Sequence, residues 1–153
     1  MSTKPKIVSF DTIFEELCMG HQSPREFCHT YLRWCHDMDD FIDGDKKIPT
    51  DEIIGTQLQL MYVFTRNEFW QHNQDSLMPL IHNSAMTFLE SERLSEDNDI
   101  QKRLASQLLK SQYQDIFYYV AYLVGGWEHS KQMSIKYRDY DIDVGPIFVK
   151  GTK

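Results

Sequence analysis

The sequence predicts an all-α fold, a compact bundle of about five or six helices that ends in an extended C-terminal tail. Apolar residues recur at the three- and four-residue spacing of a helix face through most of the chain. Residues that start or stop helices separate these stretches. With 153 residues, 41% of them hydrophobic and 25% charged, the composition is that of a folded chain, so residues 1–153 are expected to form a single helical domain.

The chain is expected to open with a loose arm, residues 1–8, and a short helix. Ser9 or Asp11 can cap this helix, predicted over 12–19. Gly20 ends it, because glycine readily adopts the backbone conformation found after a helix.

The next predicted helix, residues 24–43, carries signals at both ends. Ser23 and Glu26 form a capping box, and Pro24 suits the first helical position. Gly44 can take the left-handed conformation that terminates a helix. The apolar stripe of this helix consists of Phe27, Tyr31, Trp34, Met38, Phe41 and Ile42.

Two further helices are expected in the middle of the chain. After a turn over 44–49, Thr50 caps the first of them. Its inner face is formed by Ile54, Leu58 and Met61. Residues 65–76 fit either a continued helix or an aromatic loop. A helix follows over 77–93, with Pro79 in its first turn, where a missing N–H is harmless.

The central helix of the bundle is predicted over residues 100–124, capped by Asp97 or Asn98. From residue 116 it is apolar or aromatic on all sides, which is typical of a helix surrounded by others. Gly125 and Gly126 either break it or let another helix pass closely, and helix resumes over 127–137. The predicted core consists of Phe27, Tyr31, Trp34, Met38, Leu58, Met61, Ile81, Phe88, Leu104, Leu108, Tyr118 and Tyr122.

The end of the chain suggests self-association. Residues 139–153 are expected to form the extended tail, and its apolar Ile147, Phe148 and Val149 can dock on the body or on a neighbouring subunit. Residues 51–100 are strongly acidic, whereas the last third of the chain is net basic. Opposed charges of this kind favour a homo-oligomer.

Charge and cysteine content limit the classes of function. A formal net charge of −7 argues against broad, sequence-blind binding of nucleic acid, but it suits a surface that imitates nucleic acid. Cys18, Cys28 and Cys35 do not form a disulfide framework and are expected to be free thiols. With no signal peptide and no span of about 20 apolar residues, a cytoplasmic protein without a membrane partner is expected.

An acidic cluster at the end of helix 24–43 is the main candidate site. It contains His36, Asp37, Asp39, Asp40 and Asp43. Carboxylates are unfavourable beside the negative end of a helix dipole, and like charges four residues apart repel each other. A compensating cation is therefore expected, either from Lys46 and Lys47 or from a divalent metal. The alternative is a solvated acidic helix end.

The segment Asp39-Asp40-Phe41-Ile42-Asp43 resembles the DDxxD motif of trans-isoprenoid synthases, whose carboxylates hold magnesium bridged to a diphosphate. The resemblance covers five residues, and the chain lacks a second acidic motif. The chain is also similar in size to the all-α nucleoside triphosphate pyrophosphatases. Their paired acidic signatures are absent, although Asp37-x-x-Asp40 and Gln112-x-x-Asp115 follow the same spacing. Neither comparison assigns a family.

Asp115 is the candidate metal ligand outside this cluster. It opens the most apolar run of the chain, on the predicted face of Leu104 and Leu108, where an isolated charge would be costly. It is therefore expected either to bond a tyrosine or cap a helix, or to face the acidic cluster across the bundle and complete a site built from two helices. Two residues are weaker candidate ligands: Asp37 and Glu128, which follows the paired glycines.

The leading hypothesis is that Asp39, Asp40, Asp43 and Asp115 bind Mg²⁺ or Mn²⁺. The metal would hold a phosphate-bearing small molecule, a nucleotide or a diphosphate. An enzyme of this kind would hydrolyse a phosphoanhydride, with a carboxylate or His36 as the candidate base. The alternative is a non-catalytic interaction protein: an acidic inhibitor, a nucleic-acid mimic or a ligand-sequestering protein, of the kind that phages and other mobile elements encode.

Overall fold

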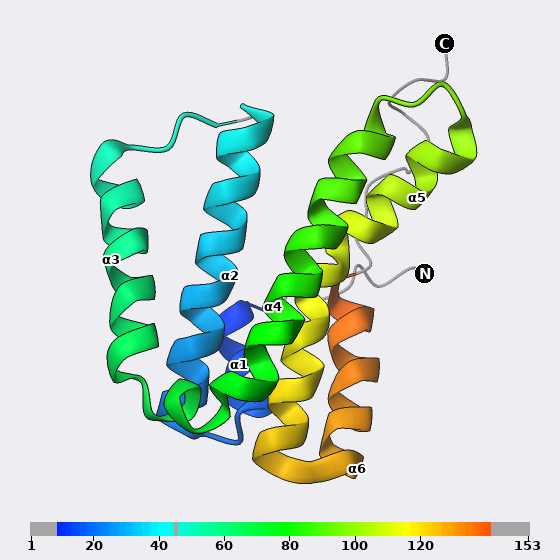
Figure 1. Ribbon diagram of the computed structural model, residues 1–153. Helices are drawn as coiled ribbons and strands as arrows, with labels where there is room; N and C mark the ends of the chain where they lie inside the picture. Colours follow the sequence, from blue (N-terminus) through cyan, green and yellow to red (C-terminus); the bar gives the residue numbers. More distant parts are fainter. Residues whose placement is uncertain (1–8, 45, 142–153) are drawn as a thin grey trace, which may run out of the picture.

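The computed structural model describes residues 9–44 and 46–141, which form six α-helices and one 3₁₀-helix with no strand among them (Figure 1). The elements are α1 (Phe10–Leu17), α2 (Gln22–Asp43), α3 (Thr50–Arg66), α4 (Glu68–Ser95), α5 (Ile100–Lys110), η1 (Ser111–Asp115) and α6 (Ile116–Asp141). The all-α prediction is confirmed. Residues 1–8 and 142–153, which include the predicted arm and most of the predicted tail, lie outside the described residues.

Four of the helices form two antiparallel pairs, and α1 and α6 pack against one end of them. α3 packs along α2, and α5 packs along α4. Figure 1 shows the two pairs leaning apart toward the end where α2 stops and α5 begins. α1 and α6 pack at the other end, where the pairs approach each other. Within the described ranges, no helix combines the length and the apolar composition needed to cross a membrane.

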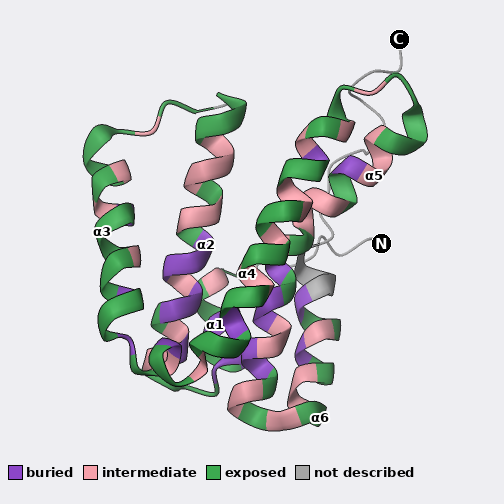
Figure 2. Cartoon of the chain, viewed as in Figure 1, coloured by how far each residue is buried: buried purple, intermediate pink, exposed green. Residues whose placement is uncertain are grey.

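The core lies at this closed end, where α1, the first half of α2 and α6 meet (Figure 2). Phe14 and Phe117 have no exposed surface, and their ring centroids are 4.9 Å apart. Tyr31 packs edge-on against Phe117 at 5.9 Å. Full burial of each large apolar side chain contributes about 1.5–3 kcal/mol, so this aromatic group anchors the first and last helices to α2.

The predicted core is correct at this end, partly correct along the cavity between α2 and α4, and wrong at four residues that are exposed. Phe27 and Tyr31 are buried, while Trp34, Met38, Ile81, Phe88, Leu104 and Tyr118 are partly buried. The exposed residues are Leu58, Met61, Leu108 and Tyr122. α3 and α5 each have one main packing neighbour, so only part of their apolar surface is covered.

The start of α2 corrects the predicted capping box. α2 begins at Gln22, and the Ser23 side chain forms hydrogen bonds at the junction of α3 and α4 instead of capping its own helix. Ser23 Oγ accepts a hydrogen bond from the backbone N–H of Phe69 at 2.8 Å and donates to Asn67 Oδ1 at 3.3 Å. Tertiary contacts therefore replace the local cap. The predicted end is confirmed, because Gly44 has φ +66°.

Residues 65–76, for which the sequence left a helix or an aromatic loop open, are helical on both sides of Asn67. Asn67 ends α3 and caps α4, accepting a hydrogen bond from the backbone N–H of Trp70 at 2.8 Å. α4 then runs 28 residues without a break, so Pro79 lies in its interior. The predicted boundary before Pro79 is wrong, since the packing of a long helix outweighs one lost hydrogen bond.

The helix predicted over 100–124 is divided into α5, η1 and the first part of α6. Asp99, rather than Asp97 or Asn98, caps α5. A kink at Gly126, where φ is +84°, divides α6 into two helical segments. A Cβ at Gly125 would lie 2.6 Å from the His129 side chain, so one glycine permits the kink and the other a close contact.

The returning segment of α6 reaches the first helix of the chain. His129 Nε2 donates a hydrogen bond to the carbonyl oxygen of Leu17 at 2.8 Å. Ser130 Oγ donates to the carbonyl oxygen of Tyr118 at 2.7 Å, which ties the two segments of α6 together.

Candidate functional site: a cavity between α2 and α4

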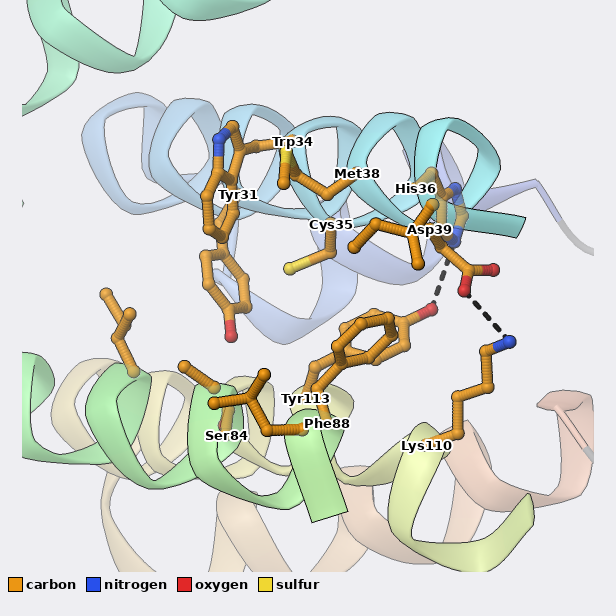
Figure 3. Close-up of a pocket in the computed structure, with 14 residues that line it drawn as sticks. Tyr31, Trp34, Cys35, His36, Met38, Asp39, Ser84, Phe88, Lys110 and Tyr113 are labelled. Atoms are coloured by element: carbon orange, nitrogen blue, oxygen red, sulfur yellow. Dashed lines mark hydrogen bonds and ion pairs between the residues drawn. The ribbon is translucent and has the colours of Figure 1, made fainter. Parts of the chain in front are cut away.

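The apolar stripe of α2 leads out of the core into a cavity of about 320 Å³ (Figure 3). Trp34, Met38 and Ile42 of α2 face Ile81 and Phe88 of α4 across it. Lys110 of α5 and Tyr113 of η1 complete the lining. Most of the partly buried residues of the predicted core therefore line this cavity. The cavity lies where the two helix pairs diverge.

The inner end of the cavity is closed by Tyr31, which is 3% exposed and lies beside Ser84 and Cys35 in the lining. Burial raises the pKa of the Tyr31 hydroxyl far above its usual value. Burial also raises the pKa of the Cys35 thiol to about 12, although Tyr31 opposes the shift. Both groups are neutral at pH 7, so neither is prepared as a base or a nucleophile.

His36, the candidate base, lies at the edge of the cavity. Its Nε2 atom is 3.0 Å from the Tyr113 hydroxyl, which also accepts a hydrogen bond from Gln114 Nε2 at 3.1 Å. The His36 ring packs edge-on against Phe10 and Tyr113. These contacts orient the imidazole as part of the wall.

The outer end of the cavity carries an ion-pair cluster, defined here as Asp39, Asp43, Glu92 and Lys110. The Lys110 ammonium lies 2.6 Å from Asp43 Oδ2, 3.0 Å from Asp39 Oδ1 and 3.9 Å from Glu92 Oε1. Figure 3 shows Lys110 reaching across from α5 to Asp39 on α2. Carboxylates of α2 and α4 thus share one positive charge, which is supplied by a lysine of α5.

This sharing alters the pKa values within the cluster. Burial lowers the pKa of Lys110, but the bonds and charges of Asp43 and Asp39 outweigh it, so the pKa rises overall. Burial raises the pKa of Asp39, and repulsion from Asp43 adds to the effect, although Lys110 opposes it. Lys110 is therefore charged over the whole physiological pH range.

The predicted ligand residues do not all converge. Asp39 and Asp43 lie together at the cluster. Asp37 points to α3, where it accepts a hydrogen bond from Thr56 Oγ1 at 2.7 Å, and Asp40 lines a shallow depression beside it. Glu128 is on α6 and pairs with Lys131 at 3.0 Å.

Asp115 is exposed on η1 and does not line the cavity, so its predicted place on a buried face is wrong. The face assigned to it is itself largely exposed at Leu108 and Tyr122, and the 3₁₀ segment interrupts the α-helical spacing on which the alignment was based. Lys110 and Glu92 are the site residues that sequence reasoning missed. The signal for Lys110 was a cation in the last turn of a helix, a common and unspecific feature.

Among the described residues, no group of three or more His, Cys, Asp or Glu side chains is placed to hold a metal ion. The cation beside Asp39 and Asp43 is Lys110 rather than Lys46 or Lys47. Binding of Mg²⁺ or Mn²⁺ stays a prediction of the sequence.

Comparison with known proteins adds no assignment: no protein-family model, curated protein or solved structure matches the chain. The function must therefore be argued from the site itself.

Proposed function

We propose that this protein is a non-catalytic binding protein whose cavity between α2 and α4 holds one apolar small molecule. The observation that supports it is the apolar, largely aromatic lining of a space of about 320 Å³. Protein interiors are normally close-packed, and small-molecule sites typically begin at roughly 300 Å³. A ligand in this space would cover the part of the α2 stripe that α4 leaves uncovered.

The chemistry of the lining favours binding over catalysis. Tyr31 and Cys35 are neutral at pH 7, and Lys110 is held by carboxylates. His36 is oriented by Tyr113. This combination supports the ligand-sequestering alternative rather than hydrolysis.

A fluorescent probe tests the proposal. N-Phenyl-1-naphthylamine is neutral, apolar and small enough for the cavity, and its emission rises in apolar surroundings. We expect one probe molecule to bind per chain, with partial quenching of Trp34. No rise in emission at protein concentrations up to about 100 µM would contradict the proposal, because a filled cavity of this size should give micromolar affinity.

A matched pair of variants locates the binding. Ala85 lines the cavity, whereas Ser76 is exposed on the same helix and does not line it. Ala85→Phe should weaken probe binding about tenfold or more, since overfilling a packed site costs about 1–3 kcal/mol. Ser76→Phe should leave it unchanged. Equal binding by both variants would place the probe elsewhere.

A divalent cation at the ion-pair cluster is a second candidate, favoured by one observation. Asp39, Asp43 and Glu92, from two helices, all lie within 3.9 Å of the Lys110 ammonium, so three carboxylates of this cluster face one positive charge. A metal there would have to displace Lys110. It would then hold the phosphate-bearing molecule that the sequence predicts.

Calorimetric titration with Mn²⁺ and then with ADP tests this candidate. We expect Asp43→Asn to abolish any metal binding of the wild type. Asp115→Asn should not change it, since Asp115 lies on η1 outside the cavity lining. No heat from Mn²⁺ with the wild type, or equal binding by Asp43→Asn, would rule out the metal.

A further inference from the structure

The outer end of the cavity is negatively charged. The ion-pair cluster sets three carboxylates against one ammonium, a net formal charge of −2 for these four residues. Lys110 is therefore not available as a positive group for an anionic ligand, because three carboxylates already lie within 3.9 Å of it. An anion that entered the cavity would meet a negative mouth.

One oxygen of the cluster is not fully satisfied. Lys110 donates its hydrogen bond to Asp43 at 2.6 Å. Asp39 Oδ1 is inaccessible to solvent, and its contact within the described part of the chain is the Lys110 ammonium at 3.0 Å, which it shares with the closer Asp43. A buried acceptor of this kind is stabilised by a further donor, above all a charged one.

The aromatic walls suit the same kind of ligand. Phe88 and Tyr113 line the cavity toward the cluster, and Trp34 lines it further in, near Tyr31. The faces of aromatic rings attract cations, and the attraction grows when water is excluded. A cation could thus contact both the rings and the carboxylate of Asp39 without leaving the cavity.

From the cavity and the charges at its mouth, we infer that the ligand is a cationic amphiphile, an organic ammonium with an aromatic or aliphatic body. The inference rests on the proposed function and names the ligand class for the same cavity. The body lies among the apolar walls, and the ammonium lies at the outer end beside Asp39.

Three compounds that share one apolar body test the inference: 1-naphthylmethylamine, 1-naphthylmethanol and 1-naphthoic acid. Each is titrated at low salt against protein loaded with N-phenyl-1-naphthylamine. We expect the amine to displace the probe at about one tenth of the concentration that the alcohol needs, and the acid to be weakest. An amine no better than the alcohol, or an acid that binds tightest, would overturn the inference.

This order separates the two proposals. If the alcohol and the probe bind but the amine binds no more tightly than the alcohol, the cavity takes apolar ligands. In that case only the inference of a cationic ligand is wrong. If neither the alcohol nor the probe binds, the proposed function itself fails.

Variants of the cluster sharpen the result. Asp39→Asn should remove most of the preference for the amine and leave the alcohol unaffected, so the alcohol reports that the cavity is intact. Asp43→Asn provides the same test if Asp39→Asn does not fold. Lys110→Met should strengthen amine binding, whereas a lysine that recognised an anion would instead lose binding of the acid. Asp115→Asn, outside the lining, should leave all three affinities unchanged.

Discussion

At the scale of single residues, Lys110 determines the state of the acidic helix end. The sequence indicated that the carboxylates of Asp39 and Asp43 need a cation, and the structure supplies it from a position 67 residues further along the chain than Asp43. The need could be derived locally from the helix dipole and from like-charge repulsion. The source could not, because pairing between distant residues depends on tertiary packing.

Lys110→Met should lower the free energy of unfolding by about 1 kcal/mol at neutral pH, a modest value because the side chain is 35% exposed. The pKa of Lys110 is raised in the folded state, so its contribution is present below the ordinary value of 10.5 and is lost as pH rises through the folded value. It also fades in acid, once the carboxylates are protonated. Urea unfolding at several pH values measures this difference.

Lys102→Met is the matched control, since the one ion pair of Lys102 within residues 9–44 and 46–141 is with Asp97, at 3.3 Å, and its side chain is 54% exposed. Its effect should be within a few tenths of a kcal/mol. Equal losses for the two variants would mean that the cluster contributes no more than an ordinary surface pair.

At the scale of helices, Asn67 joins three elements. Its Oδ1 atom accepts hydrogen bonds from Trp70 and Ser23, and its Nδ2 atom donates to the Ser23 carbonyl at 2.9 Å. It therefore fixes the turn from α3 to α4 against the start of α2.

Asn67→Ala should destabilise the protein by about 2–3 kcal/mol, as a lost cap and an unsatisfied buried contact add together. Asp99→Ala removes a cap of α5 that bonds only its own helix and should cost about 1 kcal/mol. Thermal unfolding of both variants compares the two costs. A smaller loss for Asn67→Ala than for Asp99→Ala would contradict the joining role.

The helices themselves were largely predictable from sequence, but their boundaries were not. Gly44 and the stripe from Phe27 through Met38 identify α2 because they are local signals. Pro79 misled the prediction, because the packing of α4 outweighs the cost of an interior proline, about 3 kcal/mol. The 3₁₀ segment over Ser111–Asp115 carries no distinctive sequence signal, so the α-helical spacing used to place Asp115 did not apply there.

At the scale of the whole molecule, the divergence of the two helix pairs creates the candidate site. The sequence marked Trp34 and Met38 as apolar and inward-facing, which is correct, but apolar spacing does not distinguish a packed core from the wall of a cavity. The carboxylates of Asp39 and Asp43 were identified as site residues. Their neighbours across the cavity could be recognised only once α4 and α5 were placed.

This architecture predicts an uneven pattern of amide hydrogen exchange. Residues 116–121 of α6, in the aromatic core, should exchange slowest, and α3 and α5, each covered mainly by one neighbour, should exchange faster. An apolar ligand should slow exchange in α4 and α5 more than in α3. Uniform protection of all helices would contradict this view of the fold.

The hydrogen bond from His129 to Leu17 has a consequence for biosynthesis. α1 can pack on α2 early, but its contact with α6 forms only after His129, 112 residues beyond Leu17, has been translated. Phe14 must wait for Phe117 in the same way. Until then the nascent chain displays bare aromatic surface, and so its maturation should depend on chaperones more than that of a bundle whose neighbours follow one another in sequence.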